Sequence, residues 1–145
     1  MIETGAGGKS PFIKTYAHGA LVYSVKAAGV TYTSTRRSGA FSRATIYFYK
    51  GSTVRLTVTA PNATVDGNTY DIVMRGGVHA RSSDNTTLTA DTMTYNGKTK
   101  MLHAAGHVTA TGSSGMVVTG DRAKADLDLQ TIDITGAPVT GSQSQ

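Results

Sequence analysis

The sequence has no cysteine and no tryptophan, and only three of its 145 residues are proline. Without cysteine the chain cannot form a disulfide, a thiolate metal site or a cysteine nucleophile. No apolar run approaches the roughly 20 residues that a membrane-spanning helix needs. The opening residues, MIETGAGGKSPF, also lack the charged start and apolar stretch of a signal peptide. What remains is a chain long enough for one domain with a substantial core.

The residues that are abundant favour strands and turns. The chain has 17 glycines, even more threonines, and little leucine, which is the composition of β-structure rather than helix. Its charge is basic, with 14 Lys and Arg against 9 Asp and Glu, but the excess is scattered. Nucleic-acid binding requires basic residues clustered with aromatic ones, and the nearest candidate, YFYK at 47–50, is typical of a strand. We therefore expect no nucleic-acid partner.

A pattern of apolar residues recurs three times at an interval of 30 residues, in VTAPNATVDG, LTADTMTYNG and VTGDRAKADL. Such a period indicates a stack of similar structural units. The aligned columns are Val58, Leu88 and Val118; Ala60, Ala90 and Gly120; Ala63, Met93 and Ala123; Val65, Tyr95 and Ala125; Ile72, Leu102 and Ile132; and Met74, Ala104 and Ile134.

Within each copy the apolar columns step by two residues, which is the period of a strand. The parity slips once between Ala60 and Ala63, where we expect a corner, because a slip of one residue otherwise turns the strand over. A second slip falls on Asp66-Gly67 and Asn96-Gly97, which predict tight hairpins. A helical period can be fitted to DRAKADLDLQ, 121–130, but its repeat partners are strand-like. The sequence thus predicts an all-β protein in which two sheets fold over a shared apolar interior, with successive repeats as successive rungs.

A looser fourth copy, YSVKAAGVTY, lies upstream, where Val25, Ala27, Val30 and Tyr32 match the columns that start at Val58. We expect a single domain over residues 16–140, a flexible segment at 1–15 and a flexible tail at 141–145. Open strand edges at the two ends of the stack would favour pairing with another sheet.

Four stretches carry a family resemblance: Tyr23-x-Val25-x-Ala27, LTVTAPNATVDGNTYDIVMRGGVHA, TLTADTMTYNGKTKMLHAAGHV and GMVVTGDRAKADLDLQTIDITGAPV. Together they resemble the OstA/LptC-like superfamily, the periplasmic bridge proteins of lipopolysaccharide transport. The resemblance covers most of the chain, from about Tyr23 to Val139. The upstream Tyr-x-Val-x-Ala element favours the inner-membrane-tethered LptC type over the soluble LptA type.

The resemblance implies an open, slightly twisted β-jellyroll that carries lipopolysaccharide or a related glycolipid across the periplasm. It implies partners that pair through strand edges, namely other β-jellyroll bridge proteins and an inner-membrane ABC transporter, with self-association as a further expectation. The family's members are not enzymes and need no cofactor. They can be tethered by an N-terminal anchor, which this sequence lacks.

A carrier of this kind would hold acyl chains on the inward apolar columns, since each buried methylene is worth about 0.8 kcal/mol. Two alternatives stay open: the same side chains could close into an ordinary core, and the protein could be a structural or adhesive β-solenoid without a lipid ligand. The expected lipid-binding residues are Val58, Ala60, Val65, Ile72, Met74, Leu88, Ala90, Met93, Tyr95, Leu102, Ala104, Val118, Ile132 and Ile134.

Other chemistry finds little support in the sequence. His103 and His107 are four residues apart with His79 nearby in the repeat register, but in a strand this spacing does not bring ligands together, so we expect no metal site. No serine lies in a nucleophile elbow, and the repeated aspartates occupy turns and corners, so we expect no catalytic residues. Cations that could contact glycolipid phosphates, or simply be solvated, are Arg36, Arg37, Arg43, Lys98 and Lys100.

Overall fold

The computed structural model describes residues 2–5, 12–17, 19–33 and 38–136. Within these ranges all regular structure is β, and the strands form one 11-stranded antiparallel sheet. The strands are β1 (Ile2–Gly5), β2 (Phe12–Ala17), β3 (Ala20–Lys26), β4 (Gly29–Thr33), β5 (Ser38–Lys50), β6 (Thr53–Asp66), β7 (Ile72–Ser82), β8 (Thr87–Tyr95), β9 (Leu102–Thr111), β10 (Val117–Ala125) and β11 (Ile132–Thr135).

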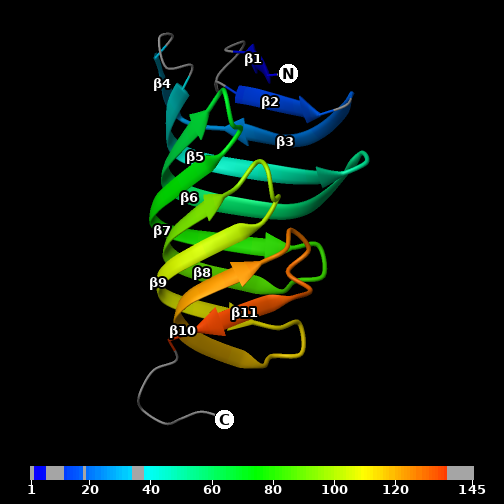
Figure 1. Cartoon of the computed structure of the whole chain (residues 1–145), viewed down its shortest axis with the longest axis vertical. Coiled ribbons are helices and arrows are strands. Elements are labelled where there is room, and N and C mark those ends of the chain that lie inside the picture. The colour runs from blue at the N-terminus through cyan, green and yellow to red at the C-terminus, as the bar shows by residue number, and fades with distance from the viewer. Residues whose placement is uncertain (1, 6–11, 18, 34–37, 137–145) are drawn as a thin grey trace.

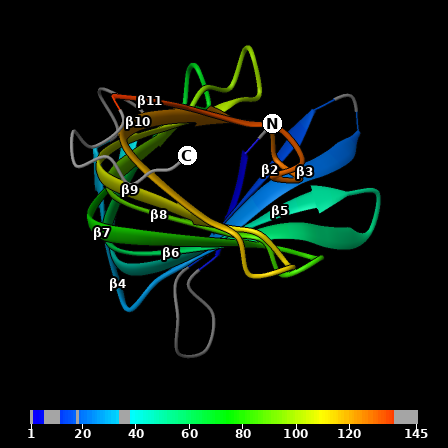
Figure 2. The same ribbon diagram turned by 90° about the horizontal axis from the view of Figure 1, so that it is seen from below.

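The strands lie in chain order along the sheet, so that β1 is at one end of the stack and β11 near the other (Figure 1). β3 and β4 both pair with β5, one on each half of it. Each long strand bends in the middle, and a view along the stack shows two arms that diverge from one line of corners (Figure 2). We call the half that contains β3 the first arm and the half that contains β4 the second arm. This arrangement confirms the predicted open β-jellyroll of stacked rungs.

The corners arise where the apolar parity slips, as predicted. The β6–β7 register shifts between Thr59 and Asn62, and Ala60 and Ala63 on either side of the shift both point into the core. Such a bulge lets one strand bend and keep the same face inward, so each expected strand–corner–strand unit is a single bent strand. The repeated glycine of the returning strand lies at the same corner. Gly106 has a φ of +82°, and a Cβ on it would lie 2.5 Å from Asp91 Oδ2.

The turns between β6 and β7 and between β8 and β9 lie where the Asp-Gly and Asn-Gly pairs predicted them, but they are longer than tight two-residue turns. Asp66 N–H donates to Asp71 O, which leaves four residues in the loop, and Asp66 Oδ1 accepts from the amides of Asn68 and Thr69. Gly97 is needed for space, because a Cβ there would lie 2.2 Å from Thr69 O in the preceding loop. Loops of successive rungs are therefore packed directly on one another.

The core lies between the two arms and runs along the stack. In the first arm, large and small side chains alternate from β6 to β10, so that Val58 and Leu88 flank Ala80. This alternation allows the facing side chains to interdigitate at the density of a protein interior. The row continues through consecutive register partners Val25, Ile46, Val58, Ala80, Leu88, Ala110 and Val118.

The N-terminal region differs from the expected boundaries. β1 and most of β2 fall within residues 1–15 and pair in the sheet, so the sheet begins before residue 16. The upstream copy forms two separate strands, β3 and β4, where later copies form one bent strand. Its Val25 and Ala27 are buried as expected, but Val30 is 43% exposed. The expected tail, 141–145, lies outside the described residues.

Candidate lipid-binding interior

The expected lipid-binding residues from Val58 to Ala104 belong to one buried cluster that follows the stack. Val58, Leu88 and Leu102 are completely inaccessible to solvent. The remaining expected residues lie at the last rung. Ile132 and Ile134 are partly buried against the cluster, and Val118 is 44% exposed, because no described strand beyond β10 covers it. The inward columns thus form a continuous apolar interior, filled in its middle rungs by its own side chains.

Aromatic side chains fill the interior of the upper rungs. The rings of Tyr23, Phe48 and Tyr95 pack with centroids 4.8–5.7 Å apart in tilted and edge-on arrangements. Tyr23 lies in the first arm, and its hydroxyl donates to Tyr70 O in the second-arm loop at 2.9 Å. Burial raises the pKa of Tyr23, and it raises the pKa of Tyr95 to about 12. Tyr23 therefore joins the two arms across the side that faces away from the corners.

An open hollow of about 540 Å³ lies at the β11 end of the interior. Its apolar lining includes Val118, Leu129, Ile132 and Ile134, and Met116 at its edge is 68% exposed. These residues continue the rows of the buried cluster, since Val118 pairs with Ala110 and Ile134 pairs with Ala123. The hollow is thus an exposed extension of the buried interior.

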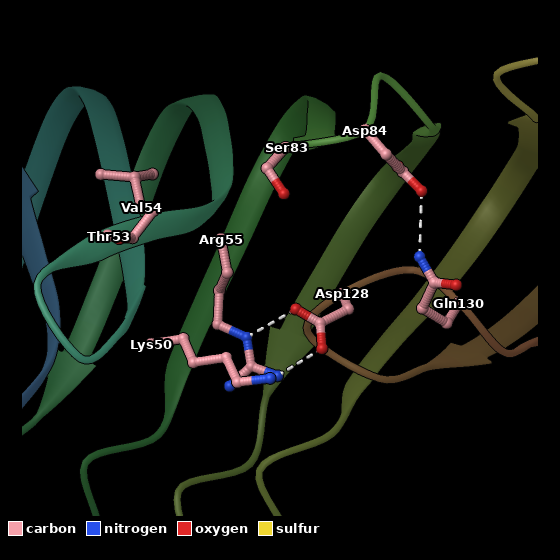
Figure 3. A pocket seen from close by; sticks show the side chains of 8 residues that line it. All are labelled: Lys50, Thr53, Val54, Arg55, Ser83, Asp84, Asp128 and Gln130. Atoms are coloured by element: carbon pink, nitrogen blue, oxygen red, sulfur yellow. Dashed lines mark hydrogen bonds and ion pairs between the residues drawn. The ribbon is translucent and has the colours of Figure 1, made fainter.

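The loop between β10 and β11, residues 126–131, leaves the second arm, extends towards the first and returns to the second arm at β11 (Figure 2). Arg55, near the start of β6, donates from Nε and Nη2 to the two carboxylate oxygens of Asp128 at 2.9 and 2.7 Å. Gln130 Nε2 donates to Asp84 Oδ2 at 2.9 Å, from the same loop to the β7–β8 turn (Figure 3). Both contacts join segments of opposite arms, so this loop links the two arms at the β11 end of the stack.

The hydrogen bonds that hold the loop favour the charged forms of the groups that make them. The Arg55 guanidinium lowers the pKa of Asp128 through its hydrogen bonds, and Asp128 raises the pKa of Arg55 in the same way. The hydroxyl of Ser82 donates to Asp84, and this bond, together with the amide of Thr86, lowers the pKa of Asp84 to about 2. At neutral pH both carboxylates are therefore ionised, so that Asp128 can accept hydrogen bonds from Arg55 and Asp84 can accept one from Gln130.

Sequence analysis missed the importance of this loop, although the repeat register contains the signal. Leu127 and Leu129 are buried, whereas the aligned positions of the preceding copy are Gly97 and Thr99. A departure from the repeat that places two leucines in a turn, where polar residues are usual, indicates a loop that covers apolar surface.

The histidines considered as metal ligands do not form a metal-binding cluster in the described part of the chain. No three His, Cys, Asp or Glu side chains there gather closely enough to hold a metal ion. His107 Nδ1 instead lies 2.8 Å from Asp91 Oδ2 on the surface, and this contact raises the pKa of His107. Among the candidate cations, Lys98 and Lys100 are exposed near the β8–β9 turn, Arg43 is exposed in β5, and Arg36 and Arg37 lie outside the described residues. No described helix is long and apolar enough to cross a membrane.

Comparisons with known proteins agree with this geometry. In the solved structures, the fold is similar to that of LptH of Pseudomonas aeruginosa, described as the LptA homologous periplasmic component of the conserved lipopolysaccharide transport device. The TM-score is 0.64 at 11% identity, over 85% of this chain and 89% of that chain. No curated protein sequence matches the chain. A family model described as lipopolysaccharide-assembly, LptC-related, matches residues 11–141. Because this match spans nearly the whole sequence and confirms the expected LptC type, the chain belongs to the LptC-related family of lipopolysaccharide-assembly proteins.

Proposed function

We propose that this protein is a non-enzymatic carrier in the periplasmic lipopolysaccharide transport bridge, where it shields acyl chains of the glycolipid in its apolar interior. The observation that carries the proposal is the continuity between the buried rows and the open hollow at the β11 end, where Val118 and Ile134 extend the interior to the surface. Transfer of an acyl chain from water onto such a surface is favourable without any covalent step. Family membership supports the identity of the lipid.

The exposed strand edge at the same end supports a bridge in which similar jellyrolls stack. In the described structure β11 pairs with Arg122–Ala125 of β10, whereas Val117–Gly120 pair only with β9. An edge of this kind can accept another strand. We propose that this end meets another β-jellyroll bridge protein or the inner-membrane ABC transporter, and that two copies of this chain can use the same edge to associate. An N-terminal membrane tether is the corresponding proposal for the opposite end of the stack.

The structural alternative, a β-solenoid with a closed core, draws support from the packing of the middle rungs. Ile72 and Leu102 are completely buried, so a charge at either position would destabilise the fold as well as any lipid site. A test of lipid binding therefore belongs at the open hollow. There the apolar residues contribute less to folding because solvent already reaches them.

The sharpest test compares Val118→Asp with Thr119→Asp. Val118 lines the hollow, and Thr119 is its exposed neighbour on the same strand, outside the lining. Because a carboxylate in an apolar site opposes acyl binding, Val118→Asp should weaken binding of lipopolysaccharide and of a fluorescent fatty acid by about ten-fold or more, or at least 1.4 kcal/mol. Thr119→Asp should bind like the unaltered protein. Equal affinities for both variants, or no saturable binding and no lipid copurifying from a Gram-negative host, would favour the closed solenoid.

A further inference from the structure

The β10–β11 loop, Asp126–Thr131, has an unusual alternation of side chains. Leu127 and Leu129 are 5% and 3% exposed and belong to the core cluster. Asp128 and Gln130 point the other way and bind Arg55 and Asp84 on the first arm. A six-residue turn thus contributes two apolar side chains to the interior and two polar contacts to the opposite arm (Figure 3). No other described loop of the second arm combines these features.

The loops at the same place in the earlier rungs are built differently. In the β8–β9 loop, Asn96 Oδ1 accepts from the amides of Lys98 and Thr99, and the left-handed residue is Lys100. In the β10–β11 loop the acceptor stays at the equivalent position, Asp126, but the donor amides lie two residues further along, at Gln130 and Thr131. The left-handed residue becomes Leu129, with a φ of 53°. The third copy therefore differs from the earlier copies in its loop, which turns two leucines inward.

The contacts that hold this loop across the groove are few and accessible. The side chains of Arg55 and Asp128 are 25% and 32% exposed, so solvent screens their ion pair and keeps it weak. A non-glycine residue at positive φ, such as Leu129, adds conformational strain to the closed position. Opening of the loop is opposed mainly by the loss of the buried apolar area of Leu127 and Leu129, and acyl methylenes that enter in their place would offset that loss.

Leu129 and Gln130 also form one wall of the open hollow. Movement of the loop away from Arg55 and Asp84 would therefore join the hollow to the buried rows above it. Resting on the proposed function, we infer that residues 126–131 form a strap, which closes the side of the groove in the empty protein and swings out to let an acyl chain replace Leu127 and Leu129. The strap makes entry of the lipid a local exchange of apolar groups, with no need to separate the two arms.

Amide hydrogen exchange tests whether the strap opens locally, without any ligand. Asp128→Ala removes the ion pair, and the amides of 127–130 should then exchange about five-fold faster, the ratio that corresponds to about 1 kcal/mol. Asp133→Ala is the matched control, since Asp133 is an exposed carboxylate on the adjacent strand β11. The charge-swapped pair Arg55→Glu/Asp128→Arg should restore slow exchange. If strap amides in the unaltered protein open only with the whole sheet, the strap is refuted.

A covalent crosslink that holds the strap closed tests its role in lipid entry. The chain has no cysteine, so Asp84→Cys/Gln130→Cys introduces a unique pair at positions whose side chains are in contact. Joining the two thiols with a short bifunctional reagent should slow the uptake of a fluorescent fatty acid at least ten-fold. The same protein treated with a monofunctional reagent of similar size controls for bulk in the hollow.

The outcomes separate the strap from the carrier function. Equal uptake by the locked and the monofunctionally treated protein would overturn the strap and leave the carrier function supported, since the lipid would then enter by another route. Absence of saturable uptake in the unaltered protein as well would overturn the carrier function, and the gating role would fall with it. Slow uptake confined to the locked protein supports both.

Discussion

Replacement of Gly97 by alanine tests how closely successive rungs are packed at the tips of the second arm. A Cβ at this position would lie 2.2 Å from Thr69 O and 3.2 Å from Tyr70 C, both backbone atoms of the preceding loop. The φ of Gly97 is not in the left-handed region, so conformational freedom does not explain the glycine. Its amide also donates to Asp71 Oδ1 at 2.6 Å. The methyl group must therefore push two loops apart and lengthen a charge-assisted hydrogen bond.

The two effects can be added only in part, because one displacement causes both. Forcing a group into a packed region costs about 1–3 kcal/mol, and a hydrogen bond to a charged acceptor contributes about 1.5–3 kcal/mol. We expect Gly97→Ala to lower the free energy of unfolding by about 2–4 kcal/mol. For a chain of this length that corresponds to a fall of roughly 5–15 °C in the melting temperature. Urea denaturation followed by far-UV circular dichroism measures the first quantity, and a thermal scan measures the second.

Gly112→Ala is the matched control, because the nearest atom to a Cβ there is 3.9 Å away and its φ is not in the left-handed region. That variant should stay within about 0.5 kcal/mol of the unaltered protein, as surface substitutions usually do. If Gly97→Ala is no less stable than Gly112→Ala, the loops are not in the close contact described, and the account of rung stacking on the second arm is wrong.

Three further outcomes follow from the core and from the titratable groups. Leu102→Ala should lower the free energy of unfolding by about 3–5 kcal/mol, because Leu102 is completely buried; a loss below about 1 kcal/mol in urea denaturation would mean that the interior collapses freely around the gap. Burial raises the pKa of Tyr95 from 10.0 to about 12, so the stability it contributes is complete below pH 10.0 and should decline as pH rises towards about 12. The difference in absorbance between the unaltered protein and Tyr95→Phe, followed as pH rises, measures the pKa of Tyr95, and ionisation of Tyr95 that is complete near pH 10.0 would contradict the prediction. The pKa of Asp128 is held below 3.8 by Arg55, so the stability lost in Asp128→Asn should be constant at higher pH and should vanish as pH falls below 3.8. Denaturation of both proteins across the acid range checks the sign, and a loss that grows with acidity would contradict it.

Much of the fold could be predicted from sequence because its determinants are local and repeated. The parity slip between Ala60 and Ala63 specified a corner, since one face must stay buried on both sides of it. The sequence could not show at which rung the inward residues are no longer covered by a following strand. Val118 has the same column as Val58 and Leu88, yet it is exposed because its cover would have to come from a further rung. The burial of Val25 and Ala27 was predicted, but Val30, which was assigned to the same set of inward columns, is 43% exposed, because it lies at an edge where burial depends on neighbours.

The departures of the third copy from the repeat explain why the interior is open at its end and closed along its side. In a stack, an inner rung is covered on both sides, so a rung at an end can be specialised with less effect on its neighbours. The third copy uses this freedom in two directions. Along the stack it leaves Met116 and Val118 uncovered beside an unpaired stretch of β10, which is the surface that a following jellyroll would need. Across the stack it turns Leu127 and Leu129 inward and pairs Asp128 with Arg55, which closes the side at this rung. In the proposed carrier, this asymmetry would let an acyl chain pass from the open end to the next protein, whereas an open side would expose the chain to water.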